Sequence, residues 1–234
     1  SIHPYCTPKS PGQAGIFDLM EAARHSVFPE PQTRRPIWVT EIGYPTNLQG
    51  GVSEWRQAEV LAQTFLLGTT RPELQGIVWY WMGPDGHDAY WAEDRFGVIR
   101  PDFKGRKPAA WPYDVLAHTL RGLTVSTAVE EISNIPGSRV IRFQGEGAKT
   151  LTAIYVEEGE YCVDILDRES VTVIPLTAAM PETLAASPAG PIQVTISPMP
   201  VLLRADEPLK LRKSKRARFL YTRSENVPRG GSAT

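Results

Sequence analysis

The stretch Arg35–Thr46 constrains the fold more than any other part of this sequence. It contains a short apolar run, Ile37 to Val39, with the length and β-branched content of a buried parallel strand. The run ends in a single carboxylate, Glu41, which is followed by glycine and proline. Because glutamate is disfavoured inside strands, Glu41 either serves chemistry at the end of this strand or caps a loop and pairs with a cation such as Arg35.

Strand-like and helical segments alternate through residues 1–122. This alternation indicates a parallel sheet with right-handed crossovers, and hence an α/β fold. Ser53 is a plausible N-cap for the middle helix, which is expected to end at Gly68. Strands are expected at 1–5, from Ile37, and at 76–82; helices are expected at 13–28, 53–67 and 109–120.

The pattern changes after Gly122 to short β-rich runs separated by Gly, Pro, Asp and Glu. These runs predict a small antiparallel β-sandwich over residues 123–205, with its closing strand at Met199–Leu203. Residues 206–234 are basic, and we expect a solvated, disordered tail; an arm for nucleic acid or an anionic surface is the alternative. The runs lie at 125–129, 139–143, 150–156, 160–166, 171–175 and 192–196.

Composition excludes several classes of protein. The 234 residues carry a formal net charge of -1, which gives no reason to expect a nucleic-acid partner. No apolar run approaches the roughly 18 residues of a membrane span, so no membrane association is expected. The opening Ser-Ile-His-Pro-Tyr lacks a methionine and a signal-peptide pattern, and we expect a trimmed or incomplete chain. Cys6 and Cys162 are expected to be unpaired thiols, and the sequence makes no prediction about oligomeric state.

Three segments in order carry a family resemblance: Ser1–Tyr5, Ile37–Tyr44 and Val78–Trp81. With their helical spacers they resemble the sixth, seventh and eighth strand units of the retaining glycoside hydrolases of clan A, such as families 39 and 5. The resemblance covers residues 1–122 and implies the last three βα units of a (β/α)8 TIM barrel. The strand-rich region that follows is similar to the β-sandwich that often trails such barrels.

The resemblance implies a site at the carboxyl ends of these strands. Glu41 matches the catalytic nucleophile, an ionised carboxylate that attacks the anomeric carbon. Tyr5 matches a hydrogen-bond donor to it, with a packed aromatic as the alternative, and His3 is better explained as a structural histidine than as a catalytic one. Trp79 or Trp81 matches the aromatic floor under the sugar. The implied substrate-binding set is His3, Trp79, Trp81 and Tyr44.

One part of the family's machinery has no counterpart in the sequence. Retaining hydrolysis needs a second carboxylate about 5 Å from the nucleophile, and Glu73, Glu93 and Asp94 do not follow a strand in the expected way. The sequence therefore predicts a fragment of a β-glycosidase that hydrolyses O-glycosidic bonds by double displacement and is inactive alone. No metal or organic cofactor is implied. The resemblance favours an extracellular or periplasmic location and a carbohydrate partner; the alternative is a non-catalytic carbohydrate-binding or scaffold protein.

Overall fold

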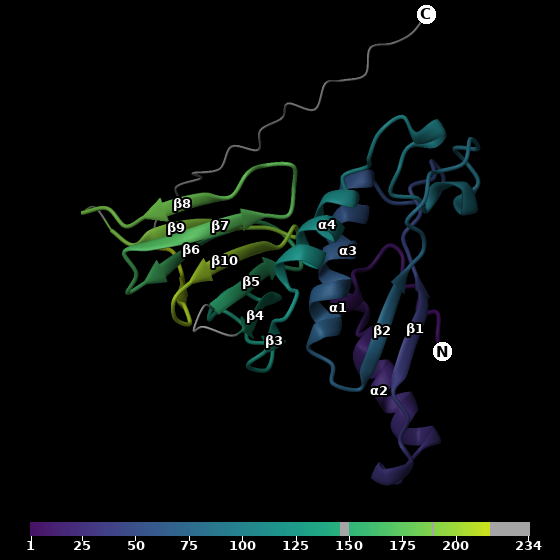
Figure 1. Ribbon diagram of the computed structural model, residues 1–234, viewed down its shortest axis with the longest axis horizontal. Coiled ribbons are helices and arrows are strands. Elements are labelled where there is room, and N and C mark those ends of the chain that lie inside the picture. The colour runs from purple at the N-terminus through teal and green to yellow at the C-terminus, as the bar shows by residue number, and fades with distance from the viewer. Residues whose placement is uncertain (146–149, 189, 216–234) are drawn as a thin grey trace, which may run out of the picture.

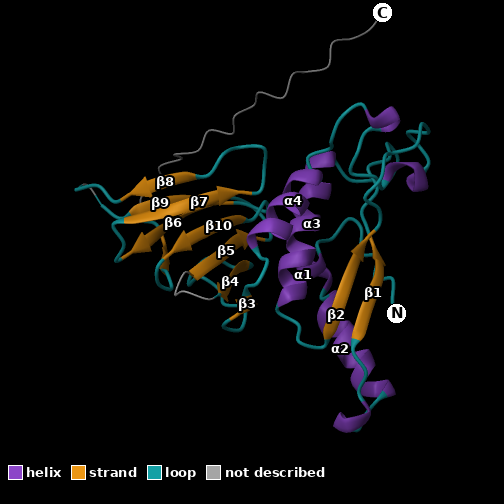
Figure 2. Cartoon of the chain, in the orientation of Figure 1, coloured by secondary structure: helices purple, strands orange, loops and turns teal. Residues whose placement is uncertain are grey.

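The computed structural model describes residues 1–145, 150–188 and 190–215. Figure 1 shows two regions: a pair of parallel strands with helices along one side, and a group of antiparallel strands on the far side of those helices. Figure 2 shows the same arrangement by secondary structure, with all of the long helices in the first region. The alternation of strands and helices in residues 1–122 is therefore confirmed, and so is the change to strands after it.

The first region is built on two parallel strands. β1 (Ile37–Ile42) pairs with β2 (Leu74–Trp79), and α3 (Glu54–Thr69) connects them. Ile2 adds one further parallel bridge to Val39 of β1, where a longer strand was expected. The other elements of this region are α1 (Pro11–Ala14), α2 (Ile16–Val27), α4 (Ala110–Thr119) and the short 3-10 helices η1 (Pro31–Thr33), η2 (Ala92–Arg95) and η3 (Pro101–Phe103).

Local sequence explains where these helices begin and break. The side chain of Ser53 accepts a hydrogen bond from the backbone N–H of Arg56, as expected of an N-cap. The single helix predicted over 13–28 is instead two helices, because Gly15 adopts a left-handed conformation with φ of 61° and ends α1. Gly68 does not end α3, which continues to Thr69.

Antiparallel strands form two sheets in the second region. The larger has the order β3-β4-β5-β10-β7-β8 and the smaller the order β11-β6-β9. The closing strand expected at Met199–Leu203 corresponds to β10, which lies between β5 and β7 in the interior of the larger sheet. It is not the last strand of the region, because β11 follows it in the sequence. The strands are β3 (Thr124–Val125), β4 (Ser138–Gln144), β5 (Thr150–Val156), β6 (Tyr161–Leu166), β7 (Ser170–Pro175), β8 (Glu182–Ala185), β9 (Ile192–Ile196), β10 (Val201–Ala205) and β11 (Lys210–Lys213).

The boundary predicted for the basic tail is wrong at its start. β11 pairs with β6, so the ordered region extends past residue 205. Asp164 of β6 and Arg212 of β11 form an ion pair at 3.0 Å, which compensates part of the positive charge that favoured a tail. The remainder of the predicted tail, residues 216–234, lies outside the described residues, as do 146–149 and 189.

The two regions share a core. α1, α3 and α4 lie between the parallel strands and the antiparallel sheets (Figure 1). One buried cluster contains Leu61 of α3, Leu116 of α4, Phe143 of β4 and Leu202 of β10. Across the same boundary, Ser10, the N-cap of α1, donates its hydroxyl to the buried carboxylate of Glu157 at 2.5 Å. A second apolar cluster is supplied by both antiparallel sheets.

Candidate active site

The candidate site lies at the carboxyl ends of the parallel strands. Because β1 and β2 run in the same direction, Glu41 and Tyr80 emerge at the same edge of the sheet. Gly43 is required there, since a side chain at this position would collide with the backbone carbonyl of Tyr80. The Tyr80 N–H donates to the Ile42 carbonyl at 2.8 Å. The glycine of the Thr-Glu-Ile-Gly stretch thus lets the chain after β2 pass directly beside the end of β1.

Both oxygens of Glu41 have a partner from the first segment of the chain. The Tyr5 hydroxyl donates a hydrogen bond to Oε1 of Glu41, and Nδ1 of His3 lies 3.5 Å from Oε2. The other ring nitrogen of His3 lies 3.1 Å from the Thr40 hydroxyl, which fixes the ring against β1. The Glu41 side chain retains 30% exposure and is open to an incoming molecule. The structure therefore brings together the three predicted residues Tyr5, His3 and Glu41.

The Tyr5 phenol is held in its protonated form. Partial burial raises the pKa of Tyr5, and the hydrogen bond to Glu41 and the charge of that carboxylate raise it further. At neutral pH the hydroxyl is consequently protonated and donates to Oε1 of Glu41. This arrangement orients one carboxylate oxygen while the side chain stays accessible.

A second tyrosine–carboxylate pair, which was not predicted, lies beside the first. The Tyr80 hydroxyl donates to Oε2 of Glu93 at 3.1 Å, and this bond is the largest cause that raises the pKa of Tyr80. Phe96 packs edge-on against both phenols, with ring centroids 5.8 Å from Tyr5 and 5.1 Å from Tyr80. One feature of the sequence could have pointed to this pair: Tyr80 directly follows Trp79, the last apolar residue of β2.

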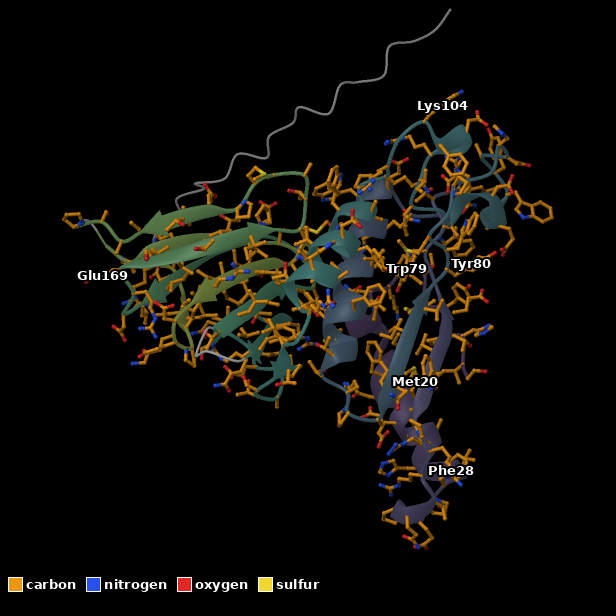
Figure 3. All side chains as sticks on the ribbon, viewed as in Figure 1. Met20, Phe28, Trp79, Tyr80, Lys104 and Glu169 are labelled. Carbon is orange, nitrogen blue, oxygen red and sulfur yellow. The ribbon has the colours of Figure 1, made fainter. Side chains whose placement is uncertain are left out.

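The structure separates the two tryptophans that the resemblance left as alternatives. Trp79 is 3% exposed and stacks on the fully buried ring of Tyr44, with centroids 6.1 Å apart. The Tyr44 hydroxyl donates to the Lys9 carbonyl at 2.7 Å. A sugar cannot reach either ring, so the expectation that Trp79 and Tyr44 contact substrate is corrected. Trp81 is 39% exposed, because β2 ends at Trp79 and the two-residue alternation stops there. Figure 3 labels Trp79 and Tyr80 at this end of β2.

Beneath the site, a buried ion pair ties the loops together. Nζ of Lys107 donates to Asp85 at 2.9 Å and to the Thr46 hydroxyl at 2.8 Å. It also donates to the Arg95 carbonyl at 3.2 Å. Asp85, whose side chain is fully buried, is thus a structural residue. His87, in the same loop, is exposed, and its Nε2 lies 3.2 Å from Oδ1 of Asp102.

The described residues lack two features that other functions would need. In residues 1–145, 150–188 and 190–215, no group of three or more His, Cys, Asp or Glu side chains is arranged to hold a metal ion. Among the helices of the described part of the chain, none combines the length and apolar content needed to cross a bilayer. Cys6 and Cys162 are free thiols, as expected.

Comparisons with known proteins bear on the fold. No protein-family model and no curated protein sequence matches the chain. Among solved structures, a family 39 glycoside hydrolase from the gut symbiont Bacteroides cellulosilyticus WH2 matches 86% of this chain, with a TM-score of 0.67 and 23% identity. A family 51 arabinofuranosidase from Xanthomonas axonopodis pv. citri matches 89% of the chain with a TM-score of 0.48 and 12% identity, and this match spans 52% of that protein.

The match to the family 39 protein is partial on that protein's side. The chain covers 43% of the length of the family 39 structure. At this level of identity the likeness concerns the fold. The chain therefore has a mixed α/β fold like that of the corresponding part of a family 39 glycoside hydrolase.

Proposed function

We propose that this chain is the C-terminal part of a retaining β-glycosidase. Residues 1–122 would form the last three βα units of a (β/α)8 barrel, and the antiparallel sheets from β3 to β11 a trailing β-sandwich. The single observation that carries the proposal is the environment of Glu41. An accessible carboxylate stands at the carboxyl end of a parallel strand, with one oxygen bonded by Tyr5 and the other approached by His3.

In this proposal Glu41 is the nucleophile. One of its oxygens forms a bond to the anomeric carbon as the bond from that carbon to the leaving-group oxygen breaks, and an acid donates a proton to this oxygen. The same acid, now a base, later takes a proton from the water that releases the sugar from Glu41. Tyr5 orients the carboxylate as a hydrogen-bond donor. The acid/base residue would come from an earlier barrel strand of the full-length protein.

An activated substrate tests Glu41 without that acid. A 2-deoxy-2-fluoro-β-glycoside with 2,4-dinitrophenolate as leaving group departs without protonation, and the fluorine slows hydrolysis of the glycosyl-enzyme. We expect a covalent adduct that peptide mapping places on Glu41. Glu41→Gln should abolish it, and Glu169→Gln should not, since Glu169 lies at the far end of the antiparallel strands (Figure 3).

Two outcomes contradict the proposal. Labelling that persists in Glu41→Gln would move the nucleophile elsewhere. Absence of labelling by glucosyl, xylosyl and galactosyl reagents, together with measurable sugar binding, would favour a carbohydrate-binding protein. The exposed rings of Trp81 and Trp91, at 39% and 61%, favour that second function.

A further inference from the structure

The Tyr80–Glu93 pair lies beside Glu41 at the carboxyl ends of β1 and β2, but the two carboxylates differ in how many protein partners they have. Glu41 has protein partners on both oxygens, whereas Glu93 is an exposed residue of η2 that accepts through Oε2 from Tyr80. Within the described residues, Oε1 of Glu93 has no hydrogen-bond partner. Glu93 therefore presents a carboxylate oxygen that can accept from a bound molecule.

The tyrosine partners of Glu41 and Glu93 pack against the same aromatic ring, that of Phe96. Phe96 lies between the two phenols and is 6% exposed, so it fixes their separation. The charge of Glu41 raises the pKa of Tyr80, and the charge of Glu93 raises the pKa of Tyr5. The two carboxylates thus lie within electrostatic range of one another's tyrosine across a single aromatic ring.

The arginine and the lysine nearest to this pair, Arg95 and Lys107, are both engaged with Asp85. NH1 of Arg95 lies 3.7 Å from the buried carboxylate of Asp85, and Lys107 is fully buried against the same group. His3 is directed at Glu41. An anionic ligand would therefore meet the carboxylates of Glu41 and Glu93, while Arg95 and Lys107 pair with Asp85. A neutral ligand with hydroxyl donors would meet acceptors that bind it through charge-assisted hydrogen bonds.

We infer that Glu93 is a specificity-determining residue that accepts a hydroxyl of a neutral sugar and discriminates against uronic acids. This inference rests on the proposed function, because it places the sugar at Glu41. Trp81, next to Tyr80 and partly exposed, adds an aromatic surface for the apolar C–H face of the same sugar. Tyr80 is a positioning residue in this arrangement, since it holds the Glu93 carboxylate by its hydroxyl.

Binding to the chain in solution tests the inference without any chemistry. Methyl β-D-glucopyranoside and its C6-oxidised counterpart, methyl β-D-glucuronide, are titrated into isotope-labelled protein while NMR follows the backbone amides. We expect the glucoside to shift signals of residues 41–44 and 80–96, and the glucuronide to bind more weakly. Glu93→Gln keeps the shape of the side chain and removes its charge. It should weaken glucoside binding about tenfold, the low end of the loss for a hydrogen bond to a charged group, and should narrow the difference between the two sugars.

The control is Glu73→Gln, at the other end of the sheet, where the Glu73 carbonyl accepts from the Ile37 N–H at 2.8 Å. It should leave both affinities unchanged, and the amide spectrum of each variant verifies its fold. The inference falls if Glu93→Gln binds both sugars as the wild type does, if the glucuronide binds as tightly as the glucoside, or if neither sugar binds. Adduct formation on Glu41 with unchanged binding in Glu93→Gln would overturn this inference alone. Sugar binding that depends on Glu93 without any adduct would overturn the assignment of Glu41 alone.

Discussion

Nζ of Lys107 lies 2.7 Å from Oδ2 of Asp85, and neither side chain is exposed to solvent. Burial lowers the pKa of Lys107, while the hydrogen bond and the charge of Asp85 act in the opposite direction. The ammonium also reaches Thr46, after β1, and the Arg95 carbonyl, at the end of η2. This pair consequently fixes the loops after both parallel strands, including the turn that carries Glu93.

Breaking this pair on one side should be costly. Lys107→Met leaves the Asp85 carboxylate buried and uncompensated, and we expect the free energy of unfolding to fall by about 3–5 kcal/mol. Urea unfolding followed by circular dichroism measures the loss. The double variant Asp85→Leu with Lys107→Met removes both charges and should recover most of the stability. A double variant no more stable than Lys107→Met would show that the loops depend on the pair itself.

Removing the Tyr5 hydroxyl should slow the chemistry proposed for Glu41. Tyr5→Phe keeps the ring against Phe96 but deletes the donor to Oε1. A hydrogen bond to a charged group contributes about 1.5–3 kcal/mol, so the rate of adduct formation should fall about tenfold or more. A time course of intact mass follows the reaction. Tyr161→Phe, in β6, is the matched control and should react as the wild type; equal rates in Tyr5→Phe would remove the orienting role.

The N-cap of α3 offers a test of local stability. Ser53→Ala removes the side-chain acceptor for the Arg56 N–H and should lower the free energy of unfolding by about 1 kcal/mol. Ser53→Asp retains an acceptor and should unfold close to the wild-type midpoint. Chemical denaturation of the three proteins provides the comparison. If Ser53→Asp loses as much as Ser53→Ala, then the hydroxyl acts through another contact.

Low pH should destabilise the pairing of β11 with β6, a strand pair that the sequence did not predict. Burial would raise the pKa of Asp164, but the hydrogen bonds from Gln193, Arg212 and Ser214 outweigh it, and the pKa is lowered. A carboxyl whose pKa is lower in the folded state stabilises the fold above its unfolded pKa of about 3.9. That contribution is lost as the pH falls through the folded value.

The measurement compares Asp164→Asn with the wild type across this range. At neutral pH the variant should be less stable in urea, because Arg212 loses its carboxylate partner. Well below about pH 3.9 the two midpoints should converge. A constant difference at every pH would mean that the charge of Asp164 is not what holds β11.

Sequence periodicity was sufficient for elements whose signals are local. Ser53 marked the start of α3, and the run 150–156 marked β5 with its observed bounds. The sequence was insufficient where distant residues decide the outcome. Lys210–Lys213 became a strand because Asp164 and β6 supply a charge partner and an edge to pair with.

The site followed the same division. Glu41 and Tyr5 were predicted by their motifs and do meet. The prediction that Trp79 contacts the sugar failed for a different reason. The alternation of side chains along a strand places Trp79 on one face of the strand, but it does not reveal that the Tyr44 ring covers that face. The Tyr80–Glu93 pair depends on how a long loop folds back, and no spacing in the sequence encodes that closure.

The carboxylate of Glu157 belongs to a strand-rich region but completes the cap of α1 through Ser10. Together with the cluster that joins Leu61 and Phe143, it makes the boundary between the regions part of the interior of both. The strand-rich region is therefore not a detachable module. Calorimetry should record one melting transition for the whole chain, and residues 123–215 expressed alone should expose Phe143 and Leu202 and lose solubility.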